Sequence, residues 1–259
     1  MLTYKNVRLV HALLSTAAVI GIFVYGNEFF YVVAALIMVY FGLIIYGVFT
    51  VRAGFFLTLY NESHSDNKDI ALTFDDGPSE YTKKVLDILK HYNIKATFFL
   101  IGKRIKGNEE VVRRLVAEGH QIGNHTYHHS HATGFYPIPK LKEELWATNA
   151  EIDRLLDLKM KLFRPPFGVT SPNLAKAVAQ LKLDVIGWSV RSLDTTAQPV
   201  EKIIQRVLKQ VKPGAVILLH DDREKCATVL ETVIPSLLKQ EYRFTTVGEL
   251  FKIEAYENH

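Results

Sequence analysis

The stretch IALTFDDGP, residues 70–78, joins an apolar run to two adjacent aspartates and a Gly-Pro pair. Residues 70–74 have the pattern of a short buried strand. Asp75 and Asp76 follow directly, and their like charges repel unless a positive group lies nearby or one carboxylate is kept for chemistry. The stretch therefore predicts a strand of the core with reactive groups at its carboxyl end.

Strand and helix patterns alternate along the chain from residue 70 onward. Strands are expected over 96–100, 121–125, 183–190 and 215–220, and helices over 81–92, 108–119, 140–156 and 199–211. This alternation predicts an α/β fold with a mainly parallel sheet. Reactive side chains of such folds gather where strands end. The residues with reactive side chains at these ends are Asp75, Asp76, His125, Arg164 and His220.

The N-terminal part is apolar and almost uncharged. Two apolar runs, 9–25 and 29–51, are separated by Gly26-Asn27-Glu28. A bilayer core needs about 20 apolar residues per helix, so the second run suffices and the first is marginal. A signal peptide or a single anchor is the alternative, but no A-x-A-like cleavage site lies between the runs. The expected organisation is a transmembrane hairpin at 1–52, a linker at 53–69 and a soluble domain at 70–256.

The charges around the hairpin bear on its orientation. Lys5, Arg8 and Arg52 flank it, whereas the connection between the runs carries only Glu28. The positive-inside rule then favours a multi-pass protein of a bacterial-type cell membrane with its domain in the cytoplasm. Three charges are weak support for this orientation, so the sequence does not decide on which side of the membrane the domain lies.

Composition excludes two kinds of site. The net charge is +4 with acids and bases mixed, and no long basic tract is present, which argues against nucleic-acid binding. The single cysteine, Cys226, excludes an internal disulfide and a cysteine-rich metal site, and we interpret it as a packing residue.

The stretch HTYHH, residues 125–129, carries a candidate metal site. His125 and His129 are four residues apart, so on a helical turn they would share a face. Two imidazoles and a carboxylate form a three-ligand site suited to Zn²⁺ and similar ions, and Asp76 is the natural third ligand. The alternative is a surface histidine cluster without metal, which is how we interpret His128 and His131.

Two further groups could then move protons. With Asp76 on a metal, Asp75 is free to act as a general base toward water. His220 could protonate the leaving amine. The cation would also offset the repulsion between the paired aspartates.

Five motifs taken together resemble the polysaccharide deacetylases of the NodB-homology type, carbohydrate esterase family 4. In chain order they are TFDDGP (73–78), HTYHH (125–129), RPPFG (164–168), RSLDT (191–195) and LLHD (218–221). The similarity runs from about Ile70 to Leu250. It implies a distorted (β/α) barrel of about seven units and metal-dependent hydrolysis of an N-acetyl group on an amino sugar.

The resemblance also implies roles for the reactive residues. Asp75 would be the base and His220 the acid, whereas Asp76, His125 and His129 would bind one divalent ion. Zn²⁺ is the first choice for that ion, with Co²⁺, Ni²⁺ and Mn²⁺ as alternatives.

Four more residues gain roles in the same way. Arg164 would orient the base and pair with Asp194. The backbone N–H of Phe167 would stabilise the oxyanion, and Leu218 would line the acetyl pocket.

The fourth motif departs from the family pattern D-x-x-D-W. Arg191 replaces its first acid and Thr195 replaces its tryptophan. The missing indole would have walled the sugar groove, so the substrate is left open. Trp146 or Trp188 could compensate, although both also suit a core. Arg191 is either a solvated charge or a contact for an anionic substrate group.

Three functions are consistent with these features. The leading one is deacetylation of a GlcNAc-containing envelope glycan, such as peptidoglycan or a chitin-like oligosaccharide. The second is deacylation of a lipid-linked sugar at the membrane face. The third is a glycan-binding pseudoenzyme, which the intact reactive residues argue against.

Overall fold

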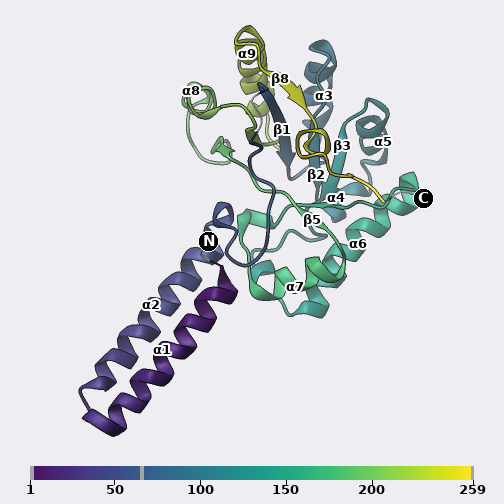
Figure 1. The fold of residues 1–259 in the computed structure, drawn as a ribbon. Helices are drawn as coiled ribbons and strands as arrows, with labels where there is room; N and C mark the ends of the chain where they lie inside the picture. The colour runs from purple at the N-terminus through teal and green to yellow at the C-terminus, as the bar shows by residue number, and fades with distance from the viewer. Residues whose placement is uncertain (1–2, 65–66, 258–259) are drawn as a thin grey trace.

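The computed structural model describes residues 3–64 and 67–257, which form a helical hairpin and an α/β domain (Figure 1). Helix α1, Tyr4–Tyr25, packs along α2, Phe29–Phe49, and both are long and apolar enough to cross a membrane. The second helix is shorter than the predicted run to residue 51. Thr50 leaves helical geometry, and Val51–Ala53 form a 3₁₀ turn that Gly54 closes with a left-handed backbone.

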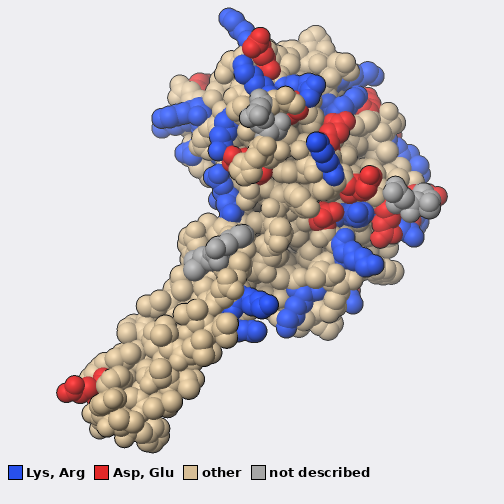
Figure 2. All heavy atoms as spheres, in the orientation of Figure 1, with Lys and Arg blue, Asp and Glu red and all other residues tan. Residues whose placement is uncertain are grey.

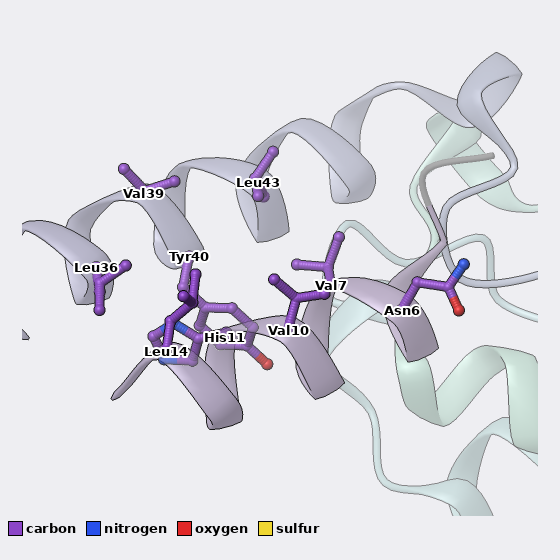
Figure 3. Close-up of a pocket in the computed structure, with 9 residues that line it drawn as sticks. All are labelled: Asn6, Val7, Val10, His11, Leu14, Leu36, Val39, Tyr40 and Leu43. Atoms are coloured by element: carbon purple, nitrogen blue, oxygen red, sulfur yellow. The ribbon is translucent and has the colours of Figure 1, made fainter. Parts of the chain in front are cut away.

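The two helices of the hairpin leave a groove of about 240 Å³ between them (Figure 3). Near its middle the rings of His11 and Tyr40 stack with centroids 4.3 Å apart. Its lining is Asn6, Val7, Val10, His11, Leu14, Leu36, Val39, Tyr40 and Leu43. The groove therefore belongs to the hairpin alone and contains none of the predicted site residues.

The domain is built on a sheet of eight parallel strands within the described residues. Their order is β5-β4-β3-β2-β1-β7-β6, and β8 pairs with the start of β1. The strands are β1 Asp69–Asp75, β2 Thr97–Leu100, β3 Gln121–Asn124, β4 Leu162–Phe163, β5 Asp184–Val185, β6 Val190–Arg191, β7 Val216–His220 and β8 Arg243–Thr245. The prediction of a parallel, curled α/β sheet is confirmed, with IALTFD as its central strand.

Helices cover the outer face of this sheet (Figure 1). They are α3 Thr82–His91, α4 Gly102–Ile105, α5 Glu109–Ala117, α6 Ile138–Leu156, α7 Pro172–Gln180, α8 Val200–Gln210 and α9 Lys225–Lys239, whereas α10 Val247–Phe251 packs into the apolar cluster on the other face through Val247 and Leu250. Ser171 caps the start of α7 by accepting a hydrogen bond from the Leu174 N–H. Cys226 is buried in the apolar cluster between the sheet and these helices, as expected for a packing residue.

The segment suggested as a linker lies against the domain where it is described. Tyr60 pairs with Ile186 beyond the end of β5, and Glu62 pairs with Ala215 before β7. Residues 65 and 66 lie outside the described residues. The segment before β1 thus joins the two sides of the open sheet.

The strand predicted over 183–190 is wrong, because the chain leaves the sheet after β5 and re-enters it as β6 at the opposite edge. The carbonyls of Ile186 and Gly187 accept hydrogen bonds from the Arg164 side chain instead of from a neighbouring strand. The buried arginine therefore binds the carbonyls at this point, whereas the Gly187 N–H donates to the Tyr60 carbonyl.

Candidate active site

Asp75 ends the central strand and lies between two other strand ends. The register pairs it with His220 at the end of β7 and with Phe99 on β2. Its side chain is 5% exposed, and its Oδ1 accepts a hydrogen bond of 2.8 Å from Arg164 Nη1. The sheet therefore brings a predicted base and a predicted acid together from positions 145 residues apart in the chain.

Arg164 is the positive group that balances Asp75. It is fully buried, and its guanidinium lies 4.1 Å from the ring centroid of Phe99. Its Nε and Nη2 donate to the carbonyls of Ile186 and Gly187 at 3.2 and 2.8 Å. A buried charge is tolerated when it is paired and fully hydrogen-bonded, and this arrangement fixes the Asp75 carboxylate.

Asp76 turns away from its neighbour toward two imidazoles. Its backbone has a φ of 73°, and its Oδ1 lies 3.3 Å from His129 Nε2 and 3.6 Å from His125 Nε2. This buried oxygen has no hydrogen-bond partner among the described residues. Ligand atoms of the three residues all lie within 4.8 Å of one another. An unsatisfied buried carboxylate oxygen facing two ring nitrogens fits a divalent cation.

The loop that carries the histidines is not helical, so the predicted helical turn is wrong. Thr126 and His129 have φ values of 64° and 52°, and this turn brings the His125 and His129 rings to a centroid distance of 4.7 Å. The Nδ1–H of His125 can donate to the Arg164 carbonyl at 2.8 Å, which leaves its Nε2 free to accept a cation.

Glu144 holds the same loop from α6, and sequence reasoning missed it. The carboxylate is 2% exposed and accepts from the backbone N–H of His128 at 2.9 Å. Its other oxygen lies 2.7 Å from His128 Nδ1. The signal was an acid within the apolar stripe of the predicted helix 140–156. His128 thus braces the loop through Glu144 and is not one of the three residues of the candidate cation site.

His129 stands in a setting that keeps it neutral. Burial lowers its pKa, the neighbouring His125 lowers it further, and the attraction of Asp76 only partly offsets this, so the pKa is about 4. A neutral imidazole is the form that binds metal ions.

His220 stands in the opposite setting. Burial disfavours its charge, but the hydrogen bond to Asp194 and the attraction of that carboxylate outweigh burial and raise its pKa to about 9. Its Nδ1 lies 2.8 Å from Asp194 Oδ1, and its backbone N–H donates to Oδ2 at 2.8 Å. Ser192 Oγ donates to the same carboxylate. At neutral pH this histidine carries a proton that it can donate.

The expected pairing of Arg164 with Asp194 is wrong. Arg164 pairs with Asp75, and Asp194 pairs with His220. The strand order gives the reason, because the chain leaves β6 for Asp194 directly beside the end of β7.

Phe167 and Leu218 lie at the border of this cluster. Phe167 is in the 3₁₀ turn Pro166–Gly168, has a φ of 58° and is 44% exposed. Its ring lies 4.6 Å from that of His129 and stacks on His131 at 4.4 Å. Leu218 is 3% exposed on β7 and belongs to the apolar cluster inside the curled sheet.

The two replaced residues of the fourth motif, Arg191 and Thr195, are exposed. The guanidinium of Arg191 lies 6.0 Å from the ring of the buried Trp188. Trp146 is 67% exposed on α6. Of the two tryptophans, Trp188 is therefore a core residue and Trp146 is a surface residue.

Arg104 is a second residue that sequence reasoning missed. Its Nη1 donates to the backbone carbonyl of Asp76 and lies 3.3 Å from Asp222 Oδ2. Its position in α4, four residues after the end of β2, was the available signal. It fixes the backbone of a predicted cation ligand.

Known proteins are similar to this chain in sequence and in fold. The family model for polysaccharide deacetylases matches residues 62–186. A peptidoglycan-N-acetylglucosamine deacetylase of Bacillus cereus is 37% identical over 197 residues, which cover 74% of this chain and 92% of that protein. The chain belongs to the polysaccharide deacetylase family. This deacetylase family member is also 34% identical over 192 residues to a peptidoglycan-N-acetylmuramic acid deacetylase of Bacillus subtilis, covering 72% of this chain and 73% of that protein.

A solved structure supports the same assignment. The crystal structure of a peptidoglycan N-acetylglucosamine deacetylase superposes with a TM-score of 0.72 at 32% identity, covering 76% of this chain and 94% of that one. The resemblance to carbohydrate esterase family 4 is confirmed, and with it a hydrolase that acts on the C–N bond of N-acetylated sugars.

Proposed function

We propose that this polysaccharide deacetylase is a metal-dependent, membrane-anchored enzyme that removes the N-acetyl group from an amino sugar of a cell-envelope glycan. The observation that carries the proposal is the cluster in which Asp76, His125 and His129 adjoin Asp75 and His220. A buried carboxylate oxygen of Asp76 without a hydrogen-bond partner, a fixed base and a protonated acid lie together at one end of the sheet.

Asp75 is the base of the proposed reaction. Arg164 keeps its carboxylate in place, so it can take a proton from the attacking water. A divalent cation held by Asp76, His125 and His129, with Zn²⁺ as first choice, would polarise the acetyl carbonyl and lower the pKa of water from 15.7 toward ~7.

His220 completes the proton transfer. As the C–N bond breaks, the amine nitrogen takes the proton from His220, which Asp194 orients through Nδ1. The water oxygen joins the acetyl carbon, so acetate and the free amino sugar are the products. The Phe167 N–H would stabilise the developing oxyanion, and Leu218 would border the acetyl methyl group.

The hairpin supports the membrane anchor. Most large apolar side chains that the structure exposes lie on α1 and α2, and examples are Leu9, Phe23, Tyr31, Met38 and Phe49. Figure 2 shows almost no charge along the hairpin between its two ends. An apolar surface of this extent is stable in a membrane and unstable in water.

A lipid-linked amino sugar is the second candidate substrate. The hairpin end contacts the loop that follows Phe167, which brings the site close to the membrane surface. Arg191 is exposed nearby over Trp188 and could bind an anionic group. The cations at the domain end of the hairpin favour the cytoplasmic face, where lipid-linked precursors rather than mature glycan would be met.

One experiment tests the function and separates the candidates. Acetate release by the purified full chain is measured on peptidoglycan fragments, chitopentaose and lipid-linked GlcNAc, each with and without a chelator. We expect chelation to abolish release and added Zn²⁺ to restore it. Full turnover in a metal-stripped sample would contradict the mechanism, and release only from the lipid-linked sugar would select the second candidate.

A further inference from the structure

The end of the hairpin is bonded directly to the chain that follows Phe167. Thr170 donates through Oγ1 to the Gly47 carbonyl at 3.0 Å and through its N–H to the Val48 carbonyl at 3.2 Å. These carbonyls belong to the last turn of α2, where carbonyls have no partner within the helix. Thr170 is 3% exposed, so both bonds are shielded from water. A residue of the domain thus caps α2.

A close contact within the hairpin end shapes this junction. Gly47 is the buried residue of α2, and a Cβ placed on it would lie 2.1 Å from Phe55 Cδ1. Phe55 is 2% exposed, and its carbonyl accepts from the Tyr4 N–H at 2.7 Å. The turn after α2 therefore folds back over both helices and depends on the absence of a side chain at position 47.

The same turn supports the Phe167–Gly168 backbone. Val51 is 6% exposed and belongs to one apolar cluster with Trp188 and Leu218. A Cβ on Gly168 would lie 3.4 Å from Val51 Cγ1 and 2.6 Å from Trp188 Cη2. Gly168 and Phe167 both have left-handed backbones, with φ values of 69° and 58°. This conformation is costly for phenylalanine and persists only where its surroundings hold it.

We propose that the docked hairpin is part of the active-site architecture: α2 and Val51 hold the Phe167–Gly168 turn in its working shape. Undocking the hairpin then lowers activity without altering any residue of the site. The expected loss of activity rests on the proposed function. The expected change in the Phe167–Gly168 turn rests only on the contacts described above.

The test compares two identical substitutions in one helix. Gly47→Ala forces a methyl group into the Phe55 ring, whereas Gly42→Ala meets nothing within 4 Å. Both are made in the full chain with Trp146→Phe, which leaves Trp188 as the single tryptophan of the two in the sequence. The proteins are studied in lipid nanodiscs with equal metal content.

Three measurements follow. In Gly47→Ala we expect Trp188 emission to shift to longer wavelength with stronger acrylamide quenching, and hydrogen exchange over 165–170 to speed up. Acetate release from the substrate that the parent uses best should fall about 10- to 100-fold in kcat, because small displacements of positioning groups cost this much. Gly42→Ala should match the parent in all three.

Each outcome decides the inference. Equal emission, exchange and kcat in the two variants would overturn it, and so would altered emission and exchange with an unchanged kcat. An inactive parent would refute the proposed function instead, and the emission and exchange data would then decide whether the hairpin holds the turn.

If Gly47→Ala does not fold, Thr170→Val and Thr170→Ser give the same test. Valine keeps the shape and removes the Oγ1 donor, whereas serine keeps the donor. We expect loss of the turn with valine and recovery with serine, and equal behaviour of the two would overturn the inference.

Discussion

Two histidines of this site have nearly the same exposure and opposite chemistry. The side chain of His129 is 14% exposed and that of His220 is 16% exposed. Their pKa values nevertheless lie near 4 and near 9. Burial lowers both, so the difference comes from the neighbour: His125 faces the first, and the fixed carboxylate of Asp194 holds the second.

This difference divides the site into a ligand side and a proton side. On the ligand side, the neutral imidazole of His129 and a carboxylate oxygen of Asp76 without a hydrogen-bond partner suit a cation. On the proton side, a buried carboxylate keeps an imidazole charged. The sheet brings the two sides together at the end of β1, where Asp75 and Asp76 point to different partners.

Removing a ligand should have the largest effect. Asp76→Ala or His129→Ala deletes one of three donors, and we expect loss of bound metal and of all measurable turnover. Metal content after dialysis, read by plasma mass spectrometry, checks this. His91→Ala, which alters an exposed histidine on α3, is the control and should keep its metal. Normal metal content in Asp76→Ala would show that Asp76 does not bind the metal.

Removing the base should preserve the metal and reduce the rate. Asp75→Asn retains an oxygen for Arg164 and loses the proton acceptor, so we expect kcat to fall about 10²–10⁴-fold. Metal content and kcat are measured on the same preparation. If this variant lost the metal while Asp76→Ala kept it, the roles of the two aspartates would be reversed.

The proton side should respond to pH. Because His220 is the proposed proton donor, kcat should hold below its pKa of about 9 and fall above it. Asp194→Asn removes the charge that raises this pKa, and the alkaline limb should move to lower pH, with kcat at pH 8 down about 10- to 100-fold. A pH profile with an unmoved limb would show that another group sets it.

The same raised pKa makes stability depend on pH. Because the folded pKa lies above the unfolded value of about 6.5, this histidine adds to the free energy of unfolding fully below pH 6.5. The contribution is lost as pH rises through about 9. Urea unfolding of the parent and Asp194→Asn at pH 6 and pH 9.5 should therefore differ more at pH 6, and an equal difference at both would contradict the assignment.

Substitution of Arg191, which belongs neither to the ligand side nor to the proton side, should have the smallest effect on activity. Arg191 is exposed, and exposed ion pairs contribute about 0.2–1 kcal/mol, so Arg191→Ala should raise KM about two- to five-fold for an anionic or lipid-linked substrate. The kcat should stay unchanged because the contact is equal in ground and transition states. Turnover of neutral chitopentaose that equals or exceeds that of anionic substrates, with no effect of the variant, would remove Arg191 from the substrate site.

The sequence predicts well what depends on local pattern. The pattern of apolar residues identified the strand before Asp75 and the helix over 140–156. The position of the reactive residues directly after predicted parallel strands indicated that they meet at one end of the sheet. It failed where a distant side chain decides the backbone. Arg164 draws the carbonyls of Ile186 and Gly187 out of a predicted strand, and Glu144 shapes a loop that histidine spacing alone suggests is helical.

The strand order also determines when the sheet can be completed during synthesis of the chain. Thr73 of the central strand bonds to the Ile217 carbonyl, 144 residues later in the chain. At about 5–20 residues per second, a ribosome needs between ~7 and ~30 s to supply that partner. The hairpin, residues 4–49, is made before β1, so it can fold while one side of the central strand is unpaired and His220 has not yet been made. The site can therefore be assembled only after translation has passed β7 and His220.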